Sequence, residues 1–346
     1  MSKICGVWTA GDFNAKECIG YNFGEGIKKL GYKIDQHYPA LLNPFSPPFC
    51  HLVVANGFRE NTANTASRLK EMHNVDTLVY DLGYVHRSDT KIRDGYYQLG
   101  INRLGWITDL PCPSDRFNNL NVIIPSQFDS GKDTVLICAQ KFNDPQHGFN
   151  REGMIALMEE QSAKYEKLGY EVIVRPHPKS KFESDTLNIS IGPLNEALDN
   201  CRFVVVYNST LGTEALLRGV PVIAISEEVH YKTCTATLEG DILTLPSVDT
   251  LRDYFYRLAY SQWRLEEMKE GYPFKFLLSI IAGEDPFDQG VDYTSHQSPV
   301  DPVREPLTVE GLPWRDAQKL VKLRTGKSVI SKIQLEAAVE EYNGKA

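Results

Sequence analysis

The segment RFVVVYNSTLGTEALLRGVPVIAIS, residues 202–226, indicates the fold class. It contains an apolar run typical of a strand, a short helical segment that ends near Gly219, and a second apolar run. Strands that alternate with helices in this way form a parallel sheet with helices on both faces. The stretch therefore predicts an α/β protein.

The same alternation occurs in both halves of the 346-residue chain. In the first half it predicts strands at 3–10, 51–58 and 76–84 and helices at 15–32 and 59–74. In the second half it predicts strands at 133–140, 171–178, 202–208 and 220–226, helices at 151–170, 193–201 and 209–219, and a helical finish at 250–271. A chain of this length is too long for one compact core. We therefore expect two Rossmann-like domains that face a cleft, at residues 1–128 and 129–282.

Three further segments differ in composition from these domains. Residues 85–119 are rich in Arg, Asp, Gly and aromatic residues with little periodicity, which indicates a long functional loop. Residues 283–306 contain Asp, Ser, Gln and four prolines, which is typical of a linker. Residues 307–346 predict two short helices around a Gly-Lys-Ser turn, and thus a small helical C-terminal extension.

The composition is ordinary for a soluble globular protein, with 42% hydrophobic and 24% charged residues. No apolar run approaches the roughly 20 residues that cross a bilayer, and the N-terminus does not resemble a signal peptide. The seven cysteines are odd in number and never form a C-x-x-C pair, so they predict neither a disulfide framework nor a zinc site. We expect a reduced, cytoplasmic protein. Its net charge of −8 argues against general polyanion binding, because phosphate neutralisation dominates nucleic-acid affinity.

Two strand ends carry residues suited to an anionic ligand. YEVIVRPHPKS, residues 170–180, places Arg175 and His177 where a predicted strand ends, between prolines that restrict the backbone. Ligands of open parallel sheets bind at such ends. An arginine fork and a histidine donor would clamp a phosphate or diphosphate there. The alternative is a surface turn with a hydrogen-bonded histidine.

The second strand end opens a helix. Asn208, Ser209 and Thr210 follow an apolar strand, and the free N–H groups of a helix start favour an anion. Gly212 would allow close approach of the backbone to a ligand. Glu214 stands too far along to complete a capping box, so it would accept hydrogen bonds from ribose hydroxyls. The alternatives are a plain N-cap by Ser209 or Thr210 and a solvated first-turn acid at Glu214.

RPHP, followed about thirty residues later by YNSTLGTEALLRGVPVIA, resembles the donor domain of capsule-type GT-B glycosyltransferases of the Kdo-transferase and polysialyltransferase kind. DLGY…GINRLGW and LAYSQWRLEEMKEG also resemble phage-encoded glycosyltransferases, and the whole resemblance covers residues 76–275. It implies a GT-B fold. It also implies that His177, Ser209 and Thr210 bind the phosphate of a nucleotide sugar, a CMP- or UDP-sugar, with Arg175 and Glu214 beside them.

Residues of the acceptor side are less distinctive. An inverting transfer needs a base, usually a carboxylate, and Asp81, at the end of TLVYD, and Asp12, just after the first predicted strand, are the two candidates. Each would otherwise be a turn former at a strand end. Gln140 and Lys141, with His147 beyond them, would close over the donor. No carboxylate-rich motif indicates a metal site, and no cofactor besides the donor is expected. The predicted acceptor-binding residues are Tyr84, Arg87, Tyr96, Tyr97 and Trp106.

The C-terminal extension bears on the acceptor. Residues 315–332 hold six Lys or Arg and one Asp, and the segment resembles SAP-like DNA-binding modules. Alternatively, it is an amphipathic helical pair that packs on the body. The favoured interpretation is a phage enzyme that glycosylates a hydroxymethylated pyrimidine in double-stranded DNA, with the base flipped onto an aromatic side chain.

Two other functions stay open. One is a capsule- or lipopolysaccharide-type glycosyltransferase acting on a saccharide. The other is a non-catalytic nucleotide-binding protein. An NAD-type epimerase is disfavoured, because TAGDFNAKE after the first strand contains a single glycine where a glycine-rich turn is needed.

Overall fold

A computed structural model describes most of the chain up to residue 297. The described ranges are 3–8, 13–37, 50–57, 60–87, 95–128, 132–144, 146–190 and 192–297. The chain divides into two compact units, residues 1–297 and 298–346, and all described residues belong to the first unit. The predicted extension at 307–346 and the candidate base Asp12 lie outside the described residues.

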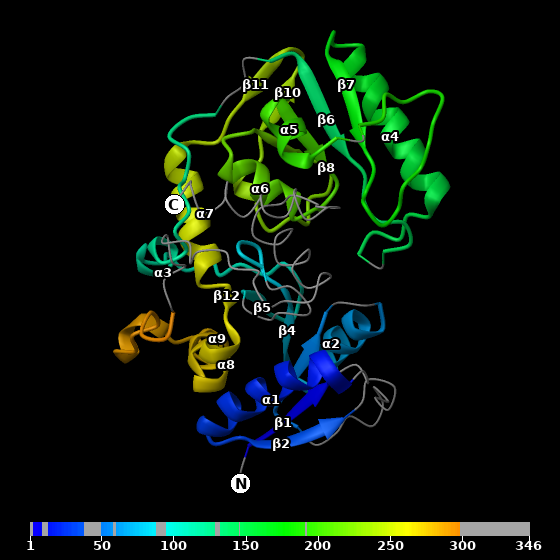
Figure 1. Cartoon of the computed structure of the whole chain (residues 1–346). Coiled ribbons are helices and arrows are strands. Elements are labelled where there is room, and N and C mark those ends of the chain that lie inside the picture. The colour runs from blue at the N-terminus through cyan, green and yellow to red at the C-terminus, as the bar shows by residue number, and fades with distance from the viewer. Residues whose placement is uncertain are drawn as a thin grey trace, which may run out of the picture. The chain divides into compact units, whose positions relative to one another are not determined.

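The first sheet has six strands in the order β12-β5-β4-β3-β1-β2 (Figure 1). Its strands are β1 (Ile4–Trp8), β2 (Lys33–His37), β3 (Leu52–Asn56), β4 (Asp76–Leu82), β5 (Tyr97–Ile101) and β12 (Gln262–Trp263). β1 to β4 pair in parallel, whereas β5 and β12 are antiparallel to their neighbours. Alternate residues of β3 face opposite sides, because the side chains of a strand alternate. Leu52 and Val54 join the core under α1 (Phe13–Lys29), and Val53 and Ala55 join the core under α2 (Glu60–His73).

The second sheet has four parallel strands in the order β7-β6-β8-β9. Its elements are β6 (Thr134–Cys138), α4 (Arg151–Glu166), β7 (Glu171–Arg175), α5 (Leu194–Asp199), β8 (Phe203–Val206), α6 (Leu211–Leu217) and β9 (Val222–Ala224). A short helix η2 (Lys232–Cys234) and a hairpin of β10 (Thr237–Glu239) and β11 (Ile242–Thr244) follow. The sequence prediction of an α/β protein with two parallel-sheet domains is confirmed. Each sheet with its helices is called a lobe below.

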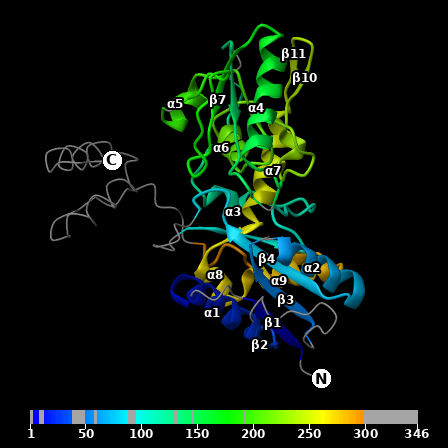
Figure 2. The same cartoon turned by 90° about the vertical axis from the view of Figure 1, so that its right-hand side faces the viewer.

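The chain leaves the second lobe through α7 (Val248–Ala259) and returns to the first sheet. There it forms β12, α8 (Leu265–Glu270), α9 (Tyr272–Ala282) and the short helix η3 (Pro286–Gln289). Figure 2 shows α8 and α9 beside α1, and contacts between α1 and α8 are extensive. A Cβ atom at Gly26 of α1 would overlap the Met268 carbonyl oxygen, so this close helix pair needs glycine.

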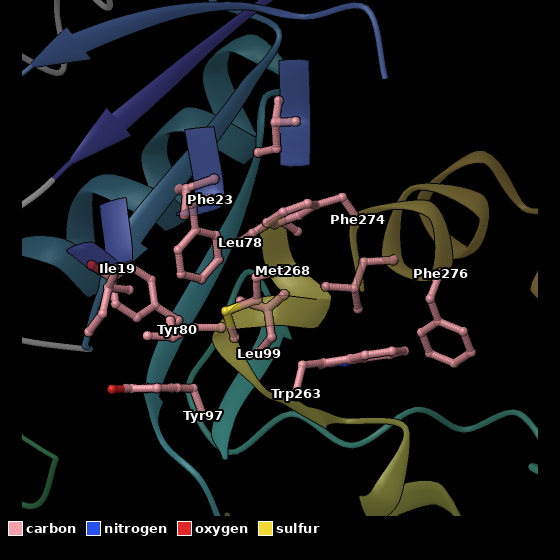
Figure 3. Close-up of a cluster of buried hydrophobic side chains, with 14 of the residues drawn as sticks. Ile19, Phe23, Leu78, Tyr80, Tyr97, Leu99, Trp263, Met268, Phe274 and Phe276 are labelled. Atoms are coloured by element: carbon pink, nitrogen blue, oxygen red, sulfur yellow. The ribbon is translucent and has the colours of Figure 1, made fainter. Parts of the chain in front are cut away.

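The returning segment completes the core of the first sheet. Figure 3 shows Trp263, Phe274 and Phe276 among side chains of α1, β4 and β5. Each of these three residues has 0% exposure. Tyr293 is also buried at 3% exposure. Within 283–297, Pro286, Tyr293 and Gln297 are buried, so the expected linker is anchored to the core at three positions, although most of its other residues are exposed. The helix expected at 250–271 is interrupted by β12, because Gln262 and Trp263 pair with Gln98 and Tyr97.

The segment 85–119, expected to be a long loop, contains β5 and a short helix α3 (Asp115–Asn118). Arg116 of α3 is fully buried and ties the returning chain to this segment. Its guanidinium lies 2.5 Å from Glu267 and donates to the carbonyls of Ala259, Gln262 and Tyr293. It also stacks on the Trp263 ring at 3.8 Å. A buried charge is tolerated only with such complete pairing.

Candidate functional site

Three turns of the second sheet carry most of the residues that the sequence singles out. They follow β7, β6 and β8, which are parallel neighbours in that order. The turns therefore lie at one edge of the sheet, the carboxyl edge where open α/β sheets bind ligands.

The turn between β8 and α6 holds Asn208, Ser209 and Thr210. The Gln140 side-chain amide reaches it from β6, and with its oxygen toward the turn it accepts from the N–H groups of Asn208 at 3.1 Å and Ser209 at 2.9 Å. The Ser209 hydroxyl accepts from the Leu211 N–H at 3.2 Å. The Thr210 side chain makes no capping hydrogen bond. Gln140 therefore orders the turn, and the Thr210 hydroxyl is available to a ligand.

Residues 141–144 and 146–149, called the loop after β6, contact both neighbouring turns. The Phe142 N–H donates to the Ser180 hydroxyl at 3.0 Å, beyond His177. The His147 ring lies 5.9 Å from the Tyr207 ring, just before Asn208. The loop thus bridges the two strand ends. In the described part of the chain, no hydrogen bond joins His177 directly to Ser209 or Thr210.

His177 is held as a neutral hydrogen-bond donor. Its Nδ1 accepts from the Lys179 N–H at 3.1 Å, which leaves the proton on Nε2. Burial lowers the pKa of His177 below its usual value, and Lys179 and Lys141 lower it further by charge repulsion. The ring therefore offers Nε2–H to an anion, and Lys141 supplies a positive charge nearby.

Arg175 points elsewhere. One guanidinium nitrogen donates to the Gly192 carbonyl at 2.6 Å. The side chain lines a pocket that contains none of His177, Asn208 or Thr210. The structure thus separates Arg175 from the phosphate clamp expected at the RPHP turn.

Gly212 serves packing within the protein. A Cβ atom there would overlap the Tyr231 ring, whose hydroxyl donates to the Ser209 carbonyl at 2.7 Å. The glycine was expected to admit a ligand, and the structure instead uses it to admit Tyr231.

Glu214 pairs with a residue of the other lobe. The Arg87 guanidinium lies 2.6 Å from the Glu214 carboxylate, and the two side chains are 42% and 38% exposed. An exposed pair of this kind is worth roughly 0–1 kcal/mol, so a ligand can replace either partner at low cost. Glu214, predicted on the donor side, therefore contacts Arg87, predicted on the acceptor side.

A pocket of about 200 Å³ contains residues of both lobes. The first lobe contributes Asp81, at the end of β4, together with Tyr84 and Arg87. The second lobe contributes Asn208 and Thr210. We call this the Asp81 pocket. It brings the candidate base to the turn expected to bind the donor.

An adjoining pocket of about 680 Å³, here the Arg103 pocket, shares Asn208, Glu228 and His230 with the Asp81 pocket. Its charged side chains balance, with three cations and three carboxylates: Arg103, Lys232, Arg257, Asp109, Glu227 and Glu228. Lys232 pairs with Glu227 at 2.6 Å. The pocket is thus polar without net charge.

His230 lines both pockets and was not anticipated from the sequence. It follows Val229 in an irregular segment, away from any strand end, so no spacing signal marks it. Its ring lies 4.4 Å from the Tyr84 ring, and its Nε2 lies 3.0 Å from the Thr213 hydroxyl. Burial lowers the pKa of His230 to about 3. The two lobes therefore meet at a neutral imidazole.

His230 should make the protein less stable in acid. Unfolded His230 binds a proton below about pH 6.5, whereas the folded residue stays neutral until about pH 3. Stability is therefore lost as pH falls through this window, by about 2 kcal/mol at pH 5. Urea unfolding at pH 7 and pH 5 should show this loss in wild type and a smaller loss in His230→Gln. His73→Gln, on the exposed end of α2, should keep the wild-type loss. An equal pH dependence in wild type and His230→Gln would contradict the expectation.

The aromatic residues expected to stack on an acceptor lie in the core. Tyr96 and Tyr97 are 0% and 3% exposed, and the Tyr96 hydroxyl accepts from Gln297 at 3.1 Å. Trp106 packs against the core of the first sheet. Tyr84 does line the Asp81 pocket, but its hydroxyl donates to Gln98 at 2.9 Å, and burial raises its pKa. Stacking by Tyr96 or Tyr97 is therefore not supported, because neither ring reaches a pocket surface.

Two further properties concern the described residues only. They contain no group of three or more His, Cys, Asp or Glu side chains that would hold a metal ion. None of their helices combines the length and apolar character of a membrane span.

Comparison with protein-family models and with curated proteins found no match. Solved structures gave several likenesses of low identity. KpsC of Thermosulfurimonas dismutans, a beta Kdo 2,7 transferase, is 12% identical with a TM-score of 0.43, over 79% of this chain and 99% of that one. A UDP-GlcNAc 2-epimerase of Methanocaldococcus jannaschii is 10% identical with a TM-score of 0.32, over 82% and 100%. The substrate-binding protein CD0873 of Clostridium difficile is 13% identical with a TM-score of 0.26, over 83% and 88%. At these TM-scores the likenesses identify no family.

Proposed function

We propose that this protein is a glycosyltransferase that moves a sugar from a nucleotide-sugar donor to a hydroxyl acceptor. One observation carries the proposal: the Asp81 pocket joins a carboxylate at the carboxyl end of the first sheet to the Asn208–Thr210 turn at the carboxyl end of the second. A base facing a phosphate-binding turn is the arrangement that such a transfer needs.

In this proposal the second lobe holds the donor. The Thr210 hydroxyl and the Nε2–H of His177 donate to the diphosphate or phosphate, and Lys141 adds positive charge. Gln140 keeps the β8–α6 turn in shape through the Asn208 and Ser209 N–H groups. Asp81 takes the proton of the attacking hydroxyl as the bond to the anomeric carbon forms and the nucleotide leaves.

We propose a saccharide rather than DNA as the acceptor. Binding to DNA needs an excess of cations, because phosphate contacts dominate its affinity. The Arg103 pocket instead carries equal numbers of cations and carboxylates. Carboxylates, amides and arginines suit sugar hydroxyls, since these both donate and accept hydrogen bonds. The DNA interpretation depended on residues 307–346, which lie outside the described residues.

Donor binding is the direct test. Nucleotide sugars are screened by thermal shift, because a ligand of the native state raises its apparent stability. We expect Thr210→Val and His177→Ala each to raise the Kd of the stabilising donor by about tenfold or more, since each removes a hydrogen bond to a charged group. Thr244→Val, on the exposed strand β11, is the matched control and should keep the wild-type Kd.

Turnover then separates the remaining functions. A transferase releases free nucleotide only with a saccharide acceptor, and the product gains one sugar. Binding without nucleotide release under any acceptor would identify a non-catalytic nucleotide-binding protein. Transfer to hydroxymethylated DNA in place of saccharides would overturn the acceptor assignment.

A further inference from the structure

Arg175 and two other cations line a separate pocket in the second lobe. This Arg151 pocket has a volume of about 970 Å³ and includes Arg151, Arg175, Lys181 and the acid Glu183 among its charged residues. It shares no residue with the Asp81 or Arg103 pockets. The proposed glycosyl transfer therefore leaves it without a role.

The wall of this pocket is fixed by backbone pairing. β7 is the edge strand of the second sheet, and the segment after the RPHP turn covers it. The Val174 N–H donates to the Asn188 carbonyl and the Ser190 N–H donates to the Val174 carbonyl, both at 2.8 Å. The Arg175 guanidinium is anchored on Gly192 at 2.6 Å. The pocket is thus formed before any ligand arrives.

Its charge is opposite to that of the whole protein. Three cations and one carboxylate give a local charge of +2, in a chain whose net charge is −8. Other arginines form ion pairs with carboxylates, as Arg87, Arg218 and Arg252 do. Within the described ranges, by contrast, Arg151, Arg175 and Lys181 form no ion pair.

Five of the eight other lining residues are apolar. Pro176 and Pro178 stand beside the cations, whereas Phe182 is 6% exposed and belongs to the core beneath them. The proline rings pack against the apolar body of a ligand, while arginine forks match the oxygens of a phosphate. A carboxylate would neutralise only half of the local charge.

We propose that the Arg151 pocket binds an organic phosphate monoester. Its phosphate, with a charge of about −1.5 to −2 at neutral pH, balances the three cations and Glu183. Its organic body packs on the rings of Pro176 and Pro178, which are not buried. This site is independent of the proposed glycosyl transfer.

Titration calorimetry of the full chain in phosphate-free buffer tests the proposal with three probes. Phenyl phosphate is the expected ligand, benzoate carries the same ring with one negative charge, and inorganic phosphate lacks the ring. We expect phenyl phosphate to bind about tenfold or more tightly than benzoate and more tightly than inorganic phosphate. The proposal would be overturned if phenyl phosphate bound no more tightly than benzoate. It would also be overturned if inorganic phosphate bound as tightly as phenyl phosphate.

Paired variants localise the site. Arg151→Gln combined with Lys181→Gln should weaken phenyl phosphate binding by about tenfold or more. The control, Lys164→Gln combined with Lys167→Gln, removes two positive charges from the exposed end of α4 and should change the Kd less than about twofold. If both double variants weakened phenyl phosphate binding equally, the effect would reflect net charge alone, and the assignment of the site would be overturned. The nucleotide-sugar Kd should stay at its wild-type value in both pairs, which separates this test from that of the proposed function.

Discussion

Arg116→Met is expected to lower the free energy of unfolding by about 3–5 kcal/mol. The substitution leaves the Glu267 carboxylate buried, at 1% exposure, without its partner. It also removes the donor from three backbone carbonyls of the returning chain. An uncompensated buried charge is among the costliest changes in a protein interior. Denaturant unfolding followed by tryptophan fluorescence measures the loss.

A double variant and a variant of a surface ion pair serve as controls for Arg116→Met. Arg116→Met combined with Glu267→Leu should recover part of the loss, because no charge is then left buried. Arg218→Met breaks a surface pair with Asp199, whose side chains are 36% and 60% exposed, and should cost at most about 1 kcal/mol. A loss in Arg116→Met no larger than in Arg218→Met would mean that the buried pair does not hold the returning chain.

Asp81→Asn is expected to lower turnover by about 10²–10⁴-fold while donor affinity stays unchanged. The Asp81 carboxylate accepts from the Leu82 N–H at 2.7 Å, and an asparagine oxygen keeps that bond. The variant therefore keeps this hydrogen bond at the end of β4 and removes the capacity to take a proton. Turnover with a saccharide acceptor and donor Kd by calorimetry are measured on the same preparation.

Glu228→Gln is the informative partner of this variant. Glu228 lines the same pocket as Asp81 and is exposed. Full turnover in Asp81→Asn with strong loss in Glu228→Gln would transfer the role of base to Glu228. Loss of donor binding in Asp81→Asn would instead point to a disturbed fold of the pocket, against the assigned role.

The sequence predicted the elements whose apolar runs are long. β1, β3, β4 and the strands β6 to β9 fall inside the predicted ranges, because strands buried on both faces are nearly continuous in apolar residues. β2 was missed, since its sequence KIDQH holds one apolar residue at the edge of the sheet. β5 was missed because it is antiparallel and lies among Gly, Arg and aromatic residues. β12 has only two residues, and its neighbours have a helical pattern on either side.

Site residues followed the same logic. Asp81 lies at the end of β4, and Asn208 and Thr210 follow β8, so topology brings them to sheet edges and the structure places them around one pocket. His230 and Glu228 come from an irregular segment whose position depends on tertiary packing, and no local pattern marks them. Tyr96 and Tyr97 were predicted to bind the acceptor, because aromatic residues in a polar segment are expected to be exposed. The sequence gives no sign of β5, the strand that buries them.

The return of the chain to the first sheet sets the order in which the two lobes can fold during synthesis. Residues up to 128 include five of the six strands of that sheet but none of Trp263, Phe274 or Phe276. A nascent chain therefore cannot close this core until nearly 300 residues have been made, whereas the second sheet has all its strands by Ala224. Domains are usually expected to fold from the N-terminus during translation. Here the later lobe should mature first, and the earlier one should wait exposed until α8 and α9 complete the layer beside α1.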